Sequence, residues 1–169
     1  MLIARHELEL HRIVVDRTYE PGSLDFHGAE FRQVDPLEVK AVGELVGEDI
    51  RIHGSLKARI EAACDRCLKP VAFPVERVFD LTYRPVSTIA REEEWKVPHE
   101  ELDIGFYEGA GVQLTEVLAE QVILALPMKL VCAEGCLGLC PVCGANRNLR
   151  GCSCPEPRPA SPFAALRGE

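Results

Sequence analysis

Alternating apolar and polar residues run through the middle of the chain. Over residues 50–64 the apolar side chains fall on nearly every second position, and most of the residues between them are charged or polar. This period of two is typical of a β-strand with one buried and one exposed face. The same period returns over 71–83, interrupted only at Arg77. The two runs predict an antiparallel hairpin with its tip at 64–70.

Weaker alternation predicts further strands upstream of this hairpin. A strand is expected over 37–45, joined to the next through the turn residues at 47–49. The apolar pairs Leu8 with Leu10 and Ile13 with Val15 favour one more N-terminal strand, although the phase slips between the two pairs. Consecutive strands joined in this way form a meander.

Helical spacing of apolar residues replaces the alternation over 114–126, and Pro127 ends the predicted helix. We expect this helix to close the open face of the sheet and to form part of the core. The predicted fold class is α+β: an antiparallel β-meander or partly closed barrel covered by one main helix, with a Cys-rich zinc-binding C-terminal segment.

Three regions follow along the chain. We expect residues 1–131 to form a β-rich core, 132–154 to form a Cys-rich segment packed with the hairpin tip at 64–67, and 155–169 to form a Pro-rich tail. The charged run over 91–103 predicts an exposed loop. In the tail, Phe163 and Leu166 belong either to a disordered end or to a short docking helix, and the pattern leaves both open.

No apolar run in the sequence has the length of a signal peptide or of a membrane span. We therefore expect a cytoplasmic protein without a membrane partner. In the reducing cytosol, eight cysteines indicate metal coordination by thiolates rather than a disulfide framework.

The spacing of the cysteines is that of metal ligands. A C-x-x-C turn lets two thiolates converge on one ion while backbone N–H groups point at the sulfur atoms, and zinc favours such closed all-sulfur shells. The second cysteine of one pair is followed by Gly144, which tolerates the positive φ of such a turn. We expect one or two zinc ions, held by the following residues: Cys64, Cys67, Cys132, Cys136, Cys140, Cys143, Cys152 and Cys154.

Two arrangements of these ligands are compatible with the spacing. In the first, the hairpin-tip pair joins Cys132 and Cys136, and the last four cysteines form a local site. In the second, the hairpin-tip pair joins Cys140 and Cys143 in a ribbon.

An enzymatic role is disfavoured, because four-thiolate sites are closed to substrate. None of the five histidines lies in the Cys-rich segment, and the sequence contains no P-loop, no dinucleotide-binding glycine signature and no G-x-S-x-G motif. We therefore expect a non-enzymatic protein without a small-molecule substrate.

The formal net charge of −8 argues against binding nucleic acid by bulk electrostatics alone. Each zinc ion held by four thiolates carries a formal charge of about −2, so two such sites would bring the folded protein to about −12. The charge is unevenly distributed, because residues 129–169 hold five basic and three acidic side chains and the remainder carries the acidic excess.

Basic residues nevertheless gather on the polar side of the strand predicted over 50–64, at the hairpin tip and in the Cys-rich segment. They form a possible RNA or partner face, although an ordinary solvated strand face is the alternative. The residues are Arg51, His53, Lys57, Arg59, Arg66, Lys69, Arg147 and Arg150.

The ordered series of motifs resembles the YceD family. It consists of Cys64-Asp-Arg-Cys-Leu-Lys-Pro-Val, the helix ending in Leu124-Ala-Leu-Pro, and the run from Cys132 to Asn148 with Cys152-Ser-Cys154. The resemblance covers the chain from about Leu37, including the C-terminal Pro162-Phe163. In the family, an Asp tends to precede the helix where this chain has Gln113, a poorer cap.

The resemblance has implications for metal binding and for function. Shorter relatives keep equivalents of the first four cysteines and lack the later four, which favours the first arrangement of ligands. The family is linked to the accumulation or processing of large-subunit (23S) ribosomal RNA, so the expected partners are ribosomal RNA or a large-subunit ribosomal protein. The alternative is an acidic, zinc-containing chaperone or adaptor for a basic ribosomal protein, without direct RNA contact.

Overall fold

The computed structural model of the chain describes residues 1–88 and 104–155. They form two compact units, which are described separately. The β unit comprises residues 1–62 and 72–128, and the cysteine unit comprises 63–71 and the chain from Lys129 onward. The charged run over 91–103 and the tail beyond Pro155, with Phe163 and Leu166, lie outside the described residues.

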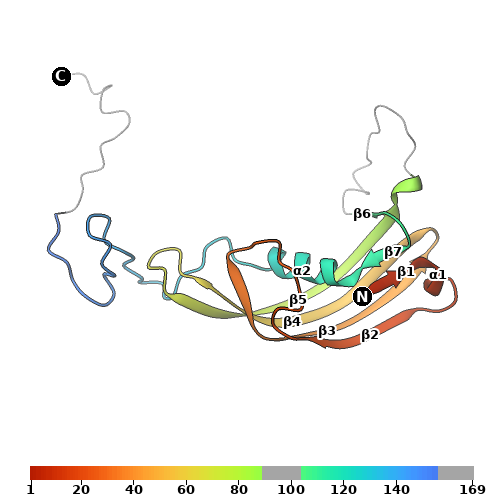
Figure 1. Ribbon diagram of the computed structural model, residues 1–169, viewed down its shortest axis with the longest axis horizontal. Coiled ribbons are helices and arrows are strands. Elements are labelled where there is room, and N and C mark those ends of the chain that lie inside the picture. Colours follow the sequence, from red (N-terminus) through yellow and green to blue (C-terminus); the bar gives the residue numbers. More distant parts are fainter. Residues whose placement is uncertain (89–103, 156–169) are drawn as a thin grey trace, which may run out of the picture. The chain divides into compact units, whose positions relative to one another are not determined.

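The main sheet has five strands in the order β2-β3-β4-β5-β6 (Figure 1). The long strands β4 and β5 are neighbours, which confirms the two alternating runs as paired strands. Between β3 and β4 the chain turns at Gly47, whose φ of 65° lies in the left-handed region that favours glycine. The bounds are β2 (Ile13–Tyr19), β3 (Phe31–Val46), β4 (Asp49–Ala63), β5 (Pro70–Pro85) and β6 (Ile104–Tyr107).

The sheet is mixed and open in the part of the chain that the structure describes. Strands β2, β3 and β4 pair antiparallel, as expected of a meander. Strand β6, however, pairs parallel to β5, and β2 and β6 stand at opposite edges of the sheet. The expectations of a purely antiparallel meander and of a partly closed barrel are therefore corrected. The parallel strand has four residues, too few for alternation to reveal.

The N-terminal prediction is corrected at Leu8 and Leu10. A short strand, β1 (Leu2–Ala4), leads into a one-turn helix, α1 (Arg5–Leu8), and the next strand begins only at Ile13. Leu8 is buried from the helix rather than from a strand, which explains the slip in phase. Strand β1 pairs with β7 (Gly111–Gln113) in a separate sheet of two strands.

The alternation along β4 separates a buried side from a half-buried to exposed one. Its apolar residues Ile50, Ile52, Leu56 and Ile60 are at most 1% exposed. They belong to one core cluster together with four residues of the helix α2 (Leu114–Leu124): Leu114, Val117, Leu118 and Val122. The core of the β unit is therefore built from sheet and helix together, and it is apolar.

Helix α2 begins where the sequence predicts it and ends slightly earlier. Gln113 occupies the N-cap position and makes no capping hydrogen bond with its side chain. Instead, the backbone N–H of Leu114 donates to the carbonyl oxygen of Met1 at 2.9 Å, so the N-terminal segment supplies the missing acceptor. The helix ends at Leu124 because Pro127 disfavours helical geometry in the residues before it. In the described parts of the chain, no helix combines the length and apolar character needed to cross a bilayer.

Candidate metal centres and charged surfaces

The eight cysteines of the chain gather into two groups of four within the cysteine unit. In each group, all four Sγ atoms lie within 4.8 Å of one another. The first group contains Cys64, Cys67, Cys132 and Cys136, and the second contains Cys140, Cys143, Cys152 and Cys154. This division coincides with the first of the two arrangements that the sequence allowed.

The sulfur spacing fits a metal ion better than it fits disulfides. The Sγ atoms of Cys67 and Cys132 are 3.6 Å apart, and those of Cys64 and Cys136 are 3.9 Å apart. All eight cysteines are free. Four sulfur ligands in a tetrahedron about 2.3 Å from a zinc ion are separated from one another by about 3.8 Å. The first group therefore has both the ligand chemistry and the spacing of a four-thiolate site.

The hairpin tip presents the first pair of cysteines through a strained turn. Leu68, which follows Cys67, has a φ of 60°, a conformation that side chains other than glycine seldom adopt. The turn is closed by hydrogen bonds from the N–H of Leu68 to the carbonyl of Cys64 and from the N–H of Cys64 to the carbonyl of Lys69, both 2.9 Å. The turn therefore forms although Leu68 stands where the other C-x-x-C pair has Gly144.

Two side chains hold the segments of the first group together. The Arg66 guanidinium donates to the carbonyl oxygen of Cys136 at 2.8 Å. The side-chain amide of Asn148 donates to the Cys136 sulfur at 3.3 Å and accepts a bond from the N–H of Leu137 at 2.8 Å. Donors to a ligating sulfur orient it and spread its charge. Sequence reasoning treated Arg66 as part of a partner face and assigned no role to Asn148, because spacing does not reveal contacts of this kind.

The second group contains the C-x-x-C turn of Cys140 and Cys143, which is followed by Gly144 as the sequence analysis noted. This glycine has a φ of 70°, and its N–H donates to the carbonyl of Cys140 at 2.8 Å. The N–H of Val142 points at the Cys140 sulfur at 3.4 Å. An isolated bridge between Leu139 and Asn146 flanks the turn.

One thiol in each group is strongly acidified. Burial raises the pKa of Cys64, but backbone N–H groups, led by that of Arg66, outweigh burial and lower this pKa to about 6. Hydrogen bonds from the N–H groups of Cys143 and Val142 likewise lower the pKa of Cys140 to about 6. These sulfur atoms are predisposed to be thiolates, the form that binds a metal ion.

Other thiols of the same groups resist ionisation. Hydrogen bonding to Cys136 raises the pKa of Cys132 to about 12, and hydrogen bonding to Cys143 raises the pKa of Cys154 to about 12. Four sulfur atoms this close cannot all carry a negative charge unless a cation offsets their repulsion. The donor set of each group therefore matches a divalent ion that prefers sulfur ligands.

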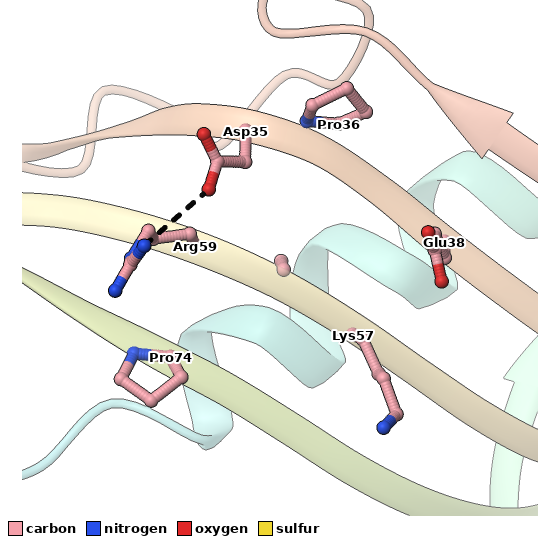
Figure 2. A pocket seen from close by; sticks show the side chains of 7 residues that line it. Asp35, Pro36, Glu38, Lys57, Arg59 and Pro74 are labelled. Carbon is pink, nitrogen blue, oxygen red and sulfur yellow. Dashed lines mark ion pairs between the residues drawn. The ribbon is translucent and has the colours of Figure 1, made fainter.

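The basic residues predicted to line a face on β4 all lie beside carboxylates. Lys57 is 3.3 Å from Glu76, and Arg59 is 3.9 Å from Asp35. Figure 2 shows Asp35 and Glu38 on β3 alongside Arg59 and Lys57 on β4, around a cleft of about 390 Å³. The charges that line this cleft therefore largely cancel.

Further along β4 the pairing is tighter. Arg51 makes two hydrogen bonds to Asp80, of 2.8 and 2.6 Å, and these bonds lower the pKa of the Asp80 carboxyl. Glu44 lies 3.5 Å from Arg51 and 3.9 Å from His53. Acidic residues on the neighbouring strands thus accompany each basic residue of this strand, an arrangement that supports sheet pairing.

The cysteine unit has a different balance of charge. Its described residues hold two acidic side chains, Asp65 and Glu134, and five basic ones: Arg66, Lys69, Lys129, Arg147 and Arg150. All five basic residues are exposed. Among the described residues, no carboxylate lies within ion-pair distance of Lys69, Lys129 or Arg150.

The relatives of this chain share most of its length. A protein of Mycobacterium tuberculosis named uncharacterized protein Rv2926c is 27% identical over 136 residues, which is 80% of this chain and 61% of that protein. Uncharacterized protein YlbN of Bacillus subtilis is 19% identical over 127 residues, which is 75% of this chain and 69% of its own length. The aligned part of the chain thus spans about three fifths of the mycobacterial relative. No solved structure matches the chain.

The family comparison covers more than half of the chain. Residues 52–168 match the family described as large ribosomal RNA subunit accumulation protein YceD. The matched region includes both groups of cysteines and helix α2. The chain therefore belongs to the YceD family.

Proposed function

We propose that this protein is a non-enzymatic, cytoplasmic accessory factor for the accumulation of 23S ribosomal RNA, and that its cysteine unit binds the RNA. The role in RNA accumulation is supported by membership of the YceD family, whose description names large ribosomal RNA subunit accumulation. The observation that carries the second part is the unequal pairing of basic side chains. Those on β4 lie beside carboxylates, whereas Lys69 and Arg150 have no carboxylate partner among the described residues.

In this proposal each group of cysteines holds one structural zinc ion. The ions supply the fold of a segment with few apolar contacts and leave no open coordination position for a substrate. Cys64, Cys136 and Cys140 are buried, and N–H groups donate to their sulfur atoms, so the negative charge on these three ligands is held away from the surface. The basic side chains remain at the surface, where RNA phosphates can reach them. Zinc knuckles are a known scaffold for binding RNA.

The RNA contact is tested with matched double variants. Lys69→Ala with Arg150→Ala removes two unpaired cations, and Lys57→Ala with Arg59→Ala removes two cations that lie beside carboxylates. Binding of a 23S ribosomal RNA transcript is measured by fluorescence anisotropy over a series of KCl concentrations. We expect the first pair to reduce the slope of log K against log[salt] by about 1.5, since each lost phosphate contact contributes about 0.7 to 0.9. If only the Lys57→Ala with Arg59→Ala variant lost RNA affinity, the RNA contact would be assigned to the outer side of β4 instead.

The biological role is tested by deleting the gene and measuring the large and small ribosomal RNAs. We expect less of the large RNA, and rescue by the intact protein but not by a Cys64→Ser form. Unchanged ribosomal RNA levels would reject the proposed function. Rescue by Cys64→Ser would show that the first metal site is dispensable for it.

The β unit supports a second candidate function, that of a chaperone or adaptor for a basic ribosomal protein. Its described residues carry many more acidic than basic side chains, and such a surface complements a basic partner. Purification of the tagged chain after nuclease treatment tests this candidate. Retention of a basic ribosomal protein would support it, and complete loss of that protein with the RNA would reject it.

A further inference from the structure

The β unit contains a second cavity, of about 340 Å³, separate from the cleft in Figure 2. Its lining comes from strands β5, β6 and β7 and from helix α2 (Figure 1). The volume lies near the lower end of the range for ligand pockets, about 300 to 1,000 Å³. Three aromatic and three acidic side chains line it: Tyr83, Phe106, Tyr107, Glu108, Glu116 and Glu120.

The three glutamates of this cavity carry negative charge that the described residues do not offset. No basic side chain there forms an ion pair with Glu108, Glu116 or Glu120. Glu116 and Glu120 lie one helical turn apart on α2, a spacing at which like charges repel. The carboxylates on β3 and β5 that flank β4, by contrast, lie beside basic residues. A cation bound in the cavity would relieve the repulsion.

The side chains of Tyr83 and Tyr107 add aromatic surface that suits an organic cation. Gly105 leaves room for the Tyr83 ring, because a Cβ atom at Gly105 would lie 2.7 Å from the Tyr83 Cε1 atom. Tyr107 is 7% exposed, and its hydroxyl has no hydrogen-bond partner among the described residues. Aromatic faces attract ammonium and guanidinium groups.

Other occupants fit less well. Within the described residues, only the two groups of cysteines bring three or more ligand atoms close enough to share a metal ion, so the glutamates do not converge as metal ligands would. An RNA phosphate would be repelled by three carboxylates. Carboxylates that do not converge on one point suit cations spaced along an extended chain better than a single point charge.

We propose that this cavity binds lysine or arginine side chains of a basic polypeptide segment. This inference deepens the second candidate function, on which it rests, because it assigns a defined pocket to the basic partner. It does not depend on RNA binding by the cysteine unit.

The test uses the full-length, zinc-loaded protein and a fluorescein-labelled oligolysine peptide, with binding followed by anisotropy. The pocket variant is Glu116→Gln with Glu120→Gln, which preserves side-chain shape and removes two charges. The matched control is Glu20→Gln with Glu48→Gln, which changes net charge equally at two exposed residues that do not line the cavity. We expect the pocket variant to weaken binding about tenfold and the control less than about twofold.

Several outcomes would overturn the inference. An equal loss of peptide affinity in the two double variants would show that binding depends on overall charge. The second candidate function would then remain, but this pocket would not be its site. If the wild-type protein did not bind oligolysine, both the pocket proposal and the second candidate function would be rejected. Competition by spermidine as strong as by unlabelled oligolysine, at equal amine concentration, would assign the pocket to a small polyamine instead. RNA binding, measured in parallel, should be unchanged in the pocket variant.

Discussion

Different interactions stabilise the interior of the β unit and the interior of the cysteine unit. The core of the β unit joins fully buried apolar side chains from β3, β4 and α2. The buried cluster of the cysteine unit consists of Cys64, Cys67 and Cys136, with a few partly buried apolar residues packed against it. A segment with so little apolar surface to bury does not offset the entropy of ordering its chain. The β unit therefore has a core that can drive its folding by apolar burial, whereas we expect the cysteine unit to need a bound ion.

Removing the metal should produce the largest effect and should separate the two units. We expect a chelator, added under reducing conditions, to unfold the cysteine unit and to leave the core of the β unit intact. Structural zinc contributes about 10 to 16 kcal/mol of apparent binding free energy at neutral pH. Two-dimensional ¹H–¹⁵N NMR measures this, because the amide signals of the two units can be followed separately.

Adding zinc back should restore the lost signals, and calcium, which prefers oxygen ligands, should not. Loss of the amide signals of Ile52 and Leu56 on metal removal would contradict the comparison, because it would show that the β core also depends on the ion. Elemental analysis of the untreated protein should find two zinc ions per chain if both groups are loaded.

A truncation in the β core should have the reverse effect. Leu118 is fully buried on α2, so Leu118→Ala should lower the free energy of unfolding of the β unit by about 2 to 5 kcal/mol. Zinc content should not change. Denaturant unfolding followed by circular dichroism measures the first quantity, and a chromophoric chelator measures the second. The matched control is Val78→Ala, since Val78 is 81% exposed on β5, with an expected change within about 0.5 kcal/mol.

Replacing a turn glycine should weaken zinc binding by the cysteine unit only. The effect should be smaller than that of the core truncation. Gly144 has a φ of 70°, so Gly144→Ala forces a Cβ atom into a left-handed conformation at a cost of about 1 kcal/mol. We expect about fivefold weaker zinc binding at the second group in a chelator competition. Gly135→Ala is the control, because Gly135 has no positive φ and a Cβ there meets no atom within 4 Å. Equal affinities in the two variants would mean that the turn is not under this constraint.

The sequence predicts the parts of the fold that are set by local periodicity. The alternation at Ile50, Ile52 and Leu56 identified a strand and its buried side, and the spacing from Leu114 identified the helix. The parallel pairing of β6 could not be predicted, because it depends on where the chain returns after the run over 91–103. The short helix at Leu8 was missed for a similar reason, since one helical turn contains too few residues to show a period.

For the candidate site, spacing predicts the cysteines but not their surroundings. Their division into two groups of four was one of two arrangements left open by the sequence, and the sulfur positions favour it. The contact between Asn148 and the Cys136 sulfur joins residues from different turns and has no signature in the spacing. Likewise, the basic stripe at Lys57 and Arg59 was readable from the sequence, but the carboxylates that lie beside it come from other strands.

The smallest expected effect concerns the charge pairing on the outer face of the β unit. Arg51 lowers the pKa of Asp80 in the folded protein, so the unfolded chain binds protons at this residue at higher pH than the folded chain does. The pair therefore stabilises the fold above the unfolded-state pKa, about 3.9, and this contribution is lost as the pH falls through the lower folded-state pKa. Asp80→Asn should lower the unfolding midpoint slightly at pH 6 and not at all at the lowest pH.

The two side chains of this pair are 43% and 54% exposed, so solvent screens the pair and the change should be much smaller than that of Leu118→Ala. The measured quantity is the difference in denaturation midpoint between Asp80→Asn and wild type at each pH. Taking this difference cancels the effect of the metal loss that we expect in both proteins in acid. Glu48→Gln is the control, because Glu48 is exposed and has no ion pair among the described residues. A difference for Asp80→Asn that stays constant with pH would show that this pair adds no pH-dependent stability to the β unit, which would then rest on apolar burial alone.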